Sequence, residues 1–87
     1  MLEFIKFERG KSGKKYAALL KNKTTGRIKK VQFGDVSYQH YKDQTGLNLW
    51  SHKDHNDSER RRRYRARHAK EKDTKFTAGW FAYHYLW

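Results

Sequence analysis

The sequence contains no cysteine and no proline, and these absences exclude some structures. Without cysteine, the chain cannot form disulfide bonds or a thiolate metal site. Without proline, it lacks one of the usual marks of a linker. No apolar run approaches the roughly 20 residues of a membrane-spanning helix, so we expect no transmembrane segment. The first residues, MLEFIKFERGKSGKK, lack the apolar region of a signal peptide, so we expect no secretion by that route.

Hydrophobic residues are also scarce, at 36% of the chain, but aromatic residues reach 16%. Each buried aromatic side chain removes roughly 150–250 Å² from water. A few of them can therefore build a compact core, which a disordered basic tail would lack. The length of 87 residues predicts a single small domain over residues 1–87.

Negative charge is the third scarce feature, because 21 Lys and Arg residues face only nine Asp and Glu residues. A net charge of +12 bears on the partners of a protein and not on its fold. The expected partners are nucleic acid, an anionic membrane surface or an acidic protein. A purely solubilising surface is the alternative, although the clustering of charge in one segment argues against it.

The first part of the chain predicts a three-stranded antiparallel meander over residues 1–35. Strands are expected at 2–9, 14–21 and 27–33, with turns at 10–13 and 22–26. Tyr16, Ala18 and Leu20 alternate and should share one face, whereas residues 2–9 carry apolar residues on both faces. The strand ends carry basic residues, among them Lys14 and Lys15, which could extend a positive surface.

The second part predicts a connecting segment over residues 36–57 and two helices. The spacing of Tyr38 and Tyr41 allows one helical turn within the connection. A basic helix is expected over 58–72, capped by Asp57 or Ser58 and docked through Tyr64. A short aromatic helix is expected over 77–87, although alternation there also allows a strand. The predicted fold class is therefore α+β, with the meander packed against both helices.

The basic helix is the main candidate for a binding site. Arginine suits phosphate because its planar fork donates two parallel hydrogen bonds. No zinc finger, zipper repeat or RNA-binding strand motif accompanies it, so we expect backbone contacts with little sequence preference, to double-stranded DNA above all. Arginines that pair with an acidic protein, or that are merely solvated, are the alternatives. The predicted nucleic-acid-binding residues are Arg60, Arg61, Arg62, Arg63, Arg65, Arg67, Lys70, Lys72, Lys14 and Lys15.

Two other groups of residues could carry chemistry. His52, Asp54, His55 and Asp57 have the side chains of metal ligands, but their spacing matches no strong signature and the following arginines oppose a cation. We expect them to cap the helix and to hydrogen-bond neighbouring arginines and tyrosines. The aromatic residues from Trp80 to Trp87 are expected to form core, with stacking on unpaired bases as the alternative.

Catalysis is not expected, because no nucleophile lies beside a base and no glycine-rich phosphate loop is present. We expect no metal, no other cofactor and no small-molecule substrate.

The chain resembles a family of small uncharacterised basic proteins of large double-stranded DNA viruses and tailed phages. The resemblance rests on VQFGD (31–35), YKDQTG (41–46), SHKDH (51–55), ERRRRYRARH (59–68) and TAGWFAYHYLW (77–87). It implies a viral source, with a place in the virion or in an intracellular replication compartment. It also implies two roles, a DNA-associated protein or a virion structural protein such as a minor capsid or cement subunit. No catalytic residue is carried over from the family.

Overall fold

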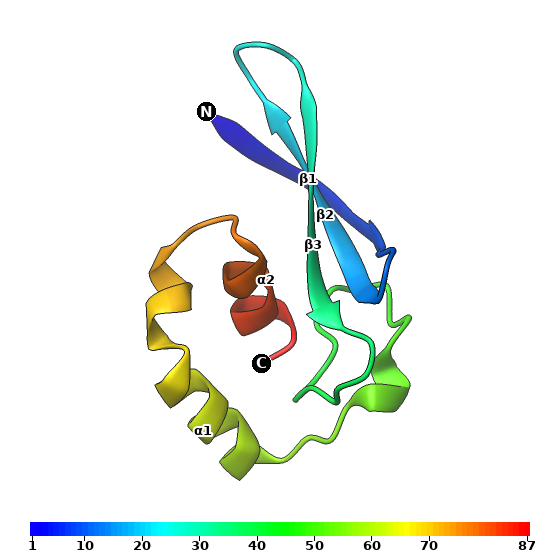
Figure 1. Ribbon diagram of the computed structural model, residues 1–87, viewed down its shortest axis with the longest axis vertical. Coiled ribbons are helices and arrows are strands. Elements are labelled where there is room, and N and C mark those ends of the chain that lie inside the picture. Colours follow the sequence, from blue (N-terminus) through cyan, green and yellow to red (C-terminus); the bar gives the residue numbers. More distant parts are fainter.

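The computed structural model describes residues 1–87 and has the predicted α+β architecture. Strands β1 (Leu2–Arg9), β2 (Lys14–Asn22) and β3 (Ile28–Asp35) form one antiparallel sheet in the order β1-β2-β3. The turns at 10–13 and 22–26 lie where their glycines predicted them, and Gly13 and Gly26 both adopt positive φ. The end of the sheet with the β2–β3 turn projects away from the helices (Figure 1).

A β-bulge explains the apolar residues on both faces of β1. The pairing of β1 with β2 shifts between Phe4 and Lys6, so Ile5 is accommodated as an extra residue. Phe4 and Phe7 consequently face the same side, with ring centroids 4.8 Å apart, while Ile5 is exposed.

The core lies between one face of the sheet and the last helix. Tyr16, Ala18 and Leu20 are buried on one face of β2, as their alternation predicted, and Phe33 joins them from β3. Phe81 stacks on Phe33 at 5.4 Å between centroids. Aromatic rings thus supply much of the volume that a chain poor in aliphatic residues must bury.

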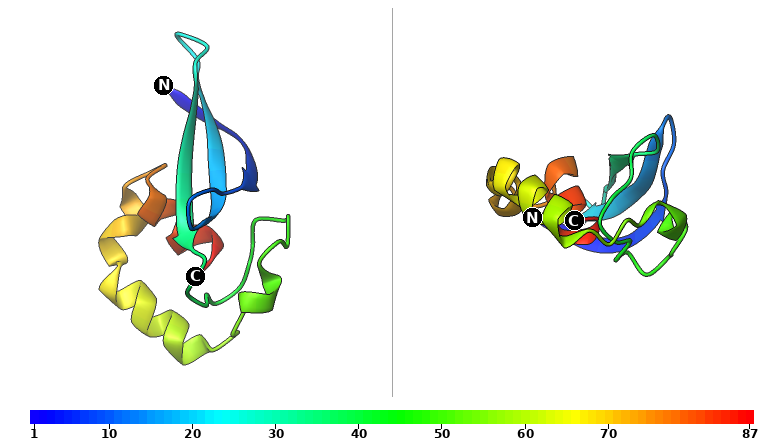
Figure 2. Two further views of the ribbon diagram at one scale, coloured as in Figure 1. Left: turned by 45° about the vertical axis from the view of Figure 1, so that its right-hand side comes forward. Right: turned by 90° about the horizontal axis from the view of Figure 1, so that it is seen from below.

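The basic segment begins as predicted but ends its α-helix early. Helix α1 (Ser58–Arg67) is capped by Asp57, whose carboxylate accepts hydrogen bonds from the amides of Glu59 and Arg60. The predicted continuation to Lys72 is wrong, because a 3₁₀ helix, η2 (Ala69–Asp73), follows the helix end at His68. Such tighter turns are frequent at helix ends, and here the chain turns back towards the sheet (Figure 2).

Helix α2 (Ala78–Tyr85) confirms the helical interpretation of the aromatic C-terminal segment. The hydroxyl of Thr77 accepts a hydrogen bond from the amide of Trp80 and caps its first turn. Phe81, Tyr83 and Leu86 are buried, so this segment forms core, as expected.

The connection between β3 and α1 has little regular structure. Its only helical element is the 3₁₀ turn η1 (Ser51–Lys53), and the helical turn suggested by Tyr38 and Tyr41 is absent. The segment instead runs past the end of α2, where the amides of Lys42 and Gln44 donate to the carbonyls of Leu86 and Tyr85. Helix-end carbonyls that would otherwise lack partners are satisfied in this way.

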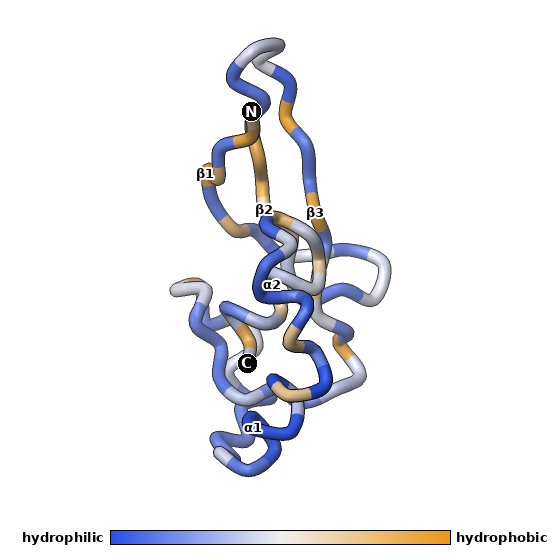
Figure 3. The backbone as a smooth tube through the Cα atoms, turned by 90° about the vertical axis from the view of Figure 1, so that its left-hand side faces the viewer, coloured by the Kyte–Doolittle hydropathy of each residue, from blue (hydrophilic) through white to orange (hydrophobic).

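The helices differ sharply in hydropathy. Figure 3 shows α1 as a hydrophilic stretch, in contrast to the alternation along the strands. No helix combines the length and apolar character required for crossing a membrane.

Candidate nucleic-acid interface

The exposed side of helix α1 carries three arginines, together with Ser58, Glu59 and Ala66. Arg62, Arg63 and Arg67 are exposed, and Arg62 forms an ion pair with Glu59 one turn earlier. Arg63 and Arg67 form no ion pair within the protein. Their guanidinium groups are therefore available to an external anion.

The inward side of α1 uses two other arginines to hold the fold together. Arg61 and Arg65 each donate from Nε to the main-chain oxygen of Trp87, at 2.8 and 3.1 Å. Their guanidinium groups also lie over aromatic rings, that of Arg61 at 5.0 Å from Tyr41 and that of Arg65 at 4.6 Å from Tyr83. Cation–π contacts of this kind contribute roughly 0.5–2 kcal/mol each. These two arginines are accordingly structural.

Tyr64 docks α1 against the end of the chain, as its position in the arginine run predicted. Its ring stacks on Trp87 at 4.2 Å between centroids and 5° between planes. His68 stacks on Tyr64, also at 4.2 Å. This three-ring stack replaces the broad apolar stripe that α1 lacks.

A groove of about 670 Å³ separates α1 from the end of the sheet, with α2 beside it. Small residues of α2, Ala78, Gly79 and Ala82, also line it, and the carboxylate of Glu71 occupies the space beside Gly79. Four Lys and Arg residues line it against one acidic residue, Asp35, the basic ones being Lys14, Lys15, Arg60 and Arg67, and His40 and His68 also line it. Electrostatics in the groove thus favour an anion.

Apart from Lys15, the predicted binding residues divide into three groups. Arg62, Arg63, Arg67, Lys70, Lys72 and Lys14 are exposed, whereas Arg61 and Arg65 are committed to internal contacts. Arg60 is half-buried and donates to Gln39 Oε1 at 3.0 Å across the groove.

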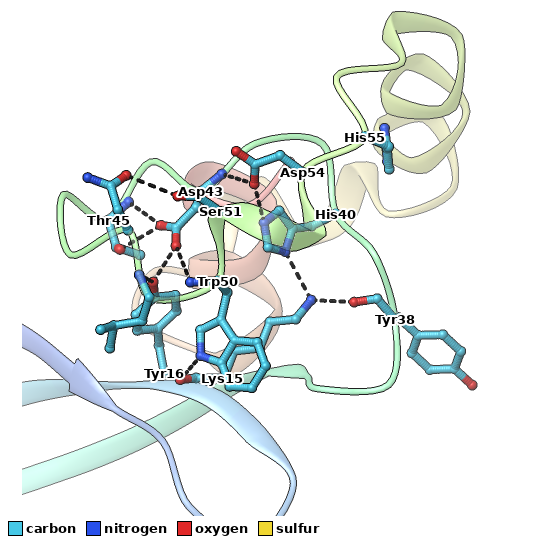
Figure 4. Close-up of polar contacts among 12 residues, drawn as sticks. Lys15, Tyr16, Tyr38, His40, Asp43, Thr45, Trp50, Ser51, Asp54 and His55 are labelled. Carbon is cyan, nitrogen blue, oxygen red and sulfur yellow. Dashed lines mark hydrogen bonds and ion pairs between the residues drawn. The ribbon is translucent and has the colours of Figure 1, made fainter.

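Lys15 corrects the prediction of an exposed basic strand end. The residue is only 2% exposed, because the connecting segment covers this end of β2. Its Nζ donates to the carbonyl oxygen of Tyr38 at 2.6 Å and to Nδ1 of His40 at 3.0 Å (Figure 4). Lys15 therefore holds the connecting segment in place and is not part of the outer charged surface.

The buried lysine begins a chain of hydrogen bonds that ends on a carboxylate. Because His40 Nδ1 accepts from Lys15, His40 carries its proton on Nε2, which donates to Asp54 Oδ1 at 2.6 Å. Burial lowers the pKa of Lys15 from 10.5 to about 8, assisted by the positive charge of Lys53. Burial, followed by the charge of Lys15, also lowers the pKa of His40. Both shifts reflect the cost of burying positive charge.

A second buried carboxylate fixes the rest of the connecting segment. Asp43 accepts from the hydroxyl of Tyr16, from the amide and hydroxyl of Thr45, and from the amide of Trp50 (Figure 4). Burial alone would raise the pKa of Asp43, but these hydrogen bonds lower it below its ordinary value. The indole of Trp50 donates to the carbonyl of Lys15 at 3.0 Å, which ties the two networks together.

The residues considered as metal ligands serve separate structural roles. Asp57 caps α1, as expected, and Asp54 accepts from His40, a partner that the sequence did not indicate. His55 Nδ1 accepts from the amide of Asp57, and its buried Nε2 has no hydrogen-bond partner. His52 is exposed beside Trp50. No group of three or more His, Cys, Asp or Glu side chains is arranged to hold a metal ion.

The geometry defines a small α+β domain with a basic helix, an adjoining basic groove and a buried polar network. The chain matches no protein-family model, no curated protein and no solved structure.

Proposed function

We propose that this protein binds nucleic acid through its phosphate backbone, without catalysis and with little sequence preference. The outward side of α1, with Arg63 and Arg67 free of internal ion pairs, carries the proposal. Guanidinium groups match phosphate geometry and release counterions when they bind it. Following the resemblance noted above, the proposed setting is the virion or replication compartment of a large DNA virus.

The use of the acidic residues within the fold supports the proposal. Asp43 and Asp54 are held in the buried network, and Asp57 caps α1. Three glutamates are neutralised by ion pairs, namely Glu3 with Lys23, Glu8 with Lys30 and Glu59 with Arg62. Of the remaining acidic residues, Asp35 lines the groove and Glu71 and Asp73 lie in η2, so Glu59, which is paired with Arg62, is the only acidic residue of α1 itself.

Binding of a labelled duplex at salt concentrations from about 50 to 400 mM tests the proposal. The slope of log K against log salt reports how many phosphates are neutralised, at about 0.9 per contact on duplex DNA. The triple variant Arg63→Gln/Arg67→Gln/Lys70→Gln is expected to flatten the slope by up to about three and to weaken binding uniformly across sequences. Arg61 and Arg65 are unsuitable for this test, because changing them removes contacts to Trp87.

A matched control removes the same charge elsewhere. Lys21→Gln/Arg27→Gln/Lys29→Gln acts at the β2–β3 turn, at the end of the sheet remote from α1 (Figure 1). This variant should bind nearly as wild type does, and equal weakening by both triple variants would show that binding depends on total charge and not on α1. Absence of binding at the lowest salt, or equally tight binding of polyglutamate, would instead favour an acidic protein partner such as a capsid surface.

A further inference from the structure

One aromatic side chain stands apart from all the others in this protein. Tyr38 is 69% exposed, whereas every other Phe, Tyr and Trp residue is buried or half-buried. Its hydroxyl makes no hydrogen bond with the protein, and its ring contacts no other aromatic ring. The other aromatic side chains contribute to stability through their burial. Tyr38 is not buried, so a role in the core does not explain its presence.

The backbone beneath Tyr38 is nevertheless fixed. Its carbonyl oxygen accepts from the buried Lys15 at 2.6 Å, and its amide donates to the carbonyl of Asp35 at 3.2 Å. Figure 4 shows the ring pointing away from the network that holds its backbone. A rigid attachment lowers the entropy that the ring must lose when it packs against a ligand.

Tyr38 is also one of the residues that line the basic groove. Tyr38 lines the groove together with Lys14, Arg60 and Arg67, and Arg60 is held in place by Gln39, the residue next to Tyr38. The groove therefore combines cations for a phosphate with one exposed aromatic face. A nucleotide whose base is not already stacked in a duplex has the complementary chemistry.

We propose that this groove binds an unpaired nucleotide, with its base stacked on Tyr38 and its phosphate held by Lys14, Arg60 and Arg67. The proposal deepens the function proposed above and rests on it. Bases inside a duplex are covered by their neighbours, so only a single strand or an unpaired end can use the ring. The protein should consequently gain affinity for single strands beyond what the phosphates provide.

A double-mutant cycle isolates this stacking contact. One change is Tyr38→Leu, and the other replaces the bases of a labelled thymidine strand of about 12 nucleotides by abasic units, which leaves its phosphates intact. Loss of the bases should weaken binding by wild type about 5- to 150-fold, the range expected for one base stacked on an aromatic ring. Tyr38→Leu should weaken binding of the intact strand to the same extent and bind both strands almost equally.

Two control variants test whether the effect of Tyr38→Leu is due to loss of the aromatic ring. Tyr38→Phe retains the aromatic face and should bind the intact strand as wild type does. Ile28→Ala removes an exposed apolar residue outside the groove and should change neither affinity. Binding of duplex should be the same for wild type and Tyr38→Leu, which also shows that the variant is folded.

The outcomes separate the two proposals. If wild type and Tyr38→Leu lose the same affinity when the bases are removed, Tyr38 does not stack and the inference fails. If Tyr38→Leu weakens duplex and single strand alike, the ring does not select an unpaired base, and the inference also fails. In both cases salt-dependent binding would leave phosphate recognition by α1 intact. Absence of binding to either nucleic acid would overturn both proposals.

Discussion

The buried position of Lys15 leads to an unusual expected dependence of stability on alkaline pH. Burial lowers the pKa of this ammonium group from 10.5 to about 8. Between these values the unfolded chain retains a proton that the folded protein has released. The free energy of unfolding therefore rises with pH in this window, because the unfolded state binds more protons.

The expected size of the rise follows from the same two values. A pKa unit corresponds to about 1.4 kcal/mol, so a change from 10.5 to about 8 is worth about 3 kcal/mol. Only part of this gain should appear by about pH 10, because unfolded lysine is still partly protonated there. The neutral amine can still donate to Tyr38 and His40, so losing the proton need not cost either hydrogen bond.

Tyr16 sets the upper limit of this window. Burial, followed by the hydrogen bond to Asp43, raises the pKa of its phenol above the ordinary value of 10.0. Above that value the unfolded chain loses the phenolic proton first, so stability should fall again. A maximum near pH 10 is therefore expected.

Urea unfolding, followed by tryptophan fluorescence at about pH 7, 8, 9 and 10, measures this rise. In Lys15→Met the rise should be absent, whereas Lys14→Met, which removes an exposed lysine at the neighbouring position, should retain it. High salt screens general repulsion among surface charges and should leave the difference between the two variants in place. Parallel pH profiles for wild type and Lys15→Met would refute the reasoning.

Two further predictions concern the stability of the helix and strand ends that position the candidate interface. Asp57→Ala should lower the free energy of unfolding by about 0.5–2 kcal/mol, because two helix amides lose their acceptor, and Asp57→Asn should restore most of it in thermal melts. Gly34→Ala should destabilise by more than about 1 kcal/mol in urea unfolding, because φ is 77° and the new Cβ would lie 2.9 Å from Leu86 Cδ1. Gly46→Ala, at similar φ but in open space, should cost less, and equal losses would show that strain alone governs both sites.

The sheet and the two helices could be predicted because their signals are local. Glycine-containing turns divide the strands, alternation places Tyr16 on the core face, and Asp57 marks the start of α1. The bulge at Ile5 was visible only as an inconsistent alternation. The end of α1 at His68 was missed, because the residues that follow have good helix propensity and the turn back towards the sheet overrides it.

The buried network could not be predicted, because its members are far apart in sequence. Lys15, His40 and Asp54 meet only after the connecting segment has folded over the end of β2. A lysine next to an exposed lysine reads as surface charge in any local pattern. The exposure of Tyr38 could not be predicted either, since a tyrosine in a polar segment gives no sign of whether the folded chain will cover it.

The arginine run shows how one residue type takes on three roles through helical geometry alone. With about 100° between successive residues, Arg61 and Arg65 lie to one side of Tyr64, while Arg60 and Arg67 lie to the other. The first pair contacts Trp87, and the second pair lines the groove, where Arg67 also belongs to the exposed outward side. Arg62 and Arg63 lie further round and face solvent. Because Tyr64 faces Trp87, its position determines whether each arginine contacts the rest of the fold, lines the groove or lies on the outer surface. Substitutions of different arginines in this run should therefore differ in their effects, although each removes one positive charge.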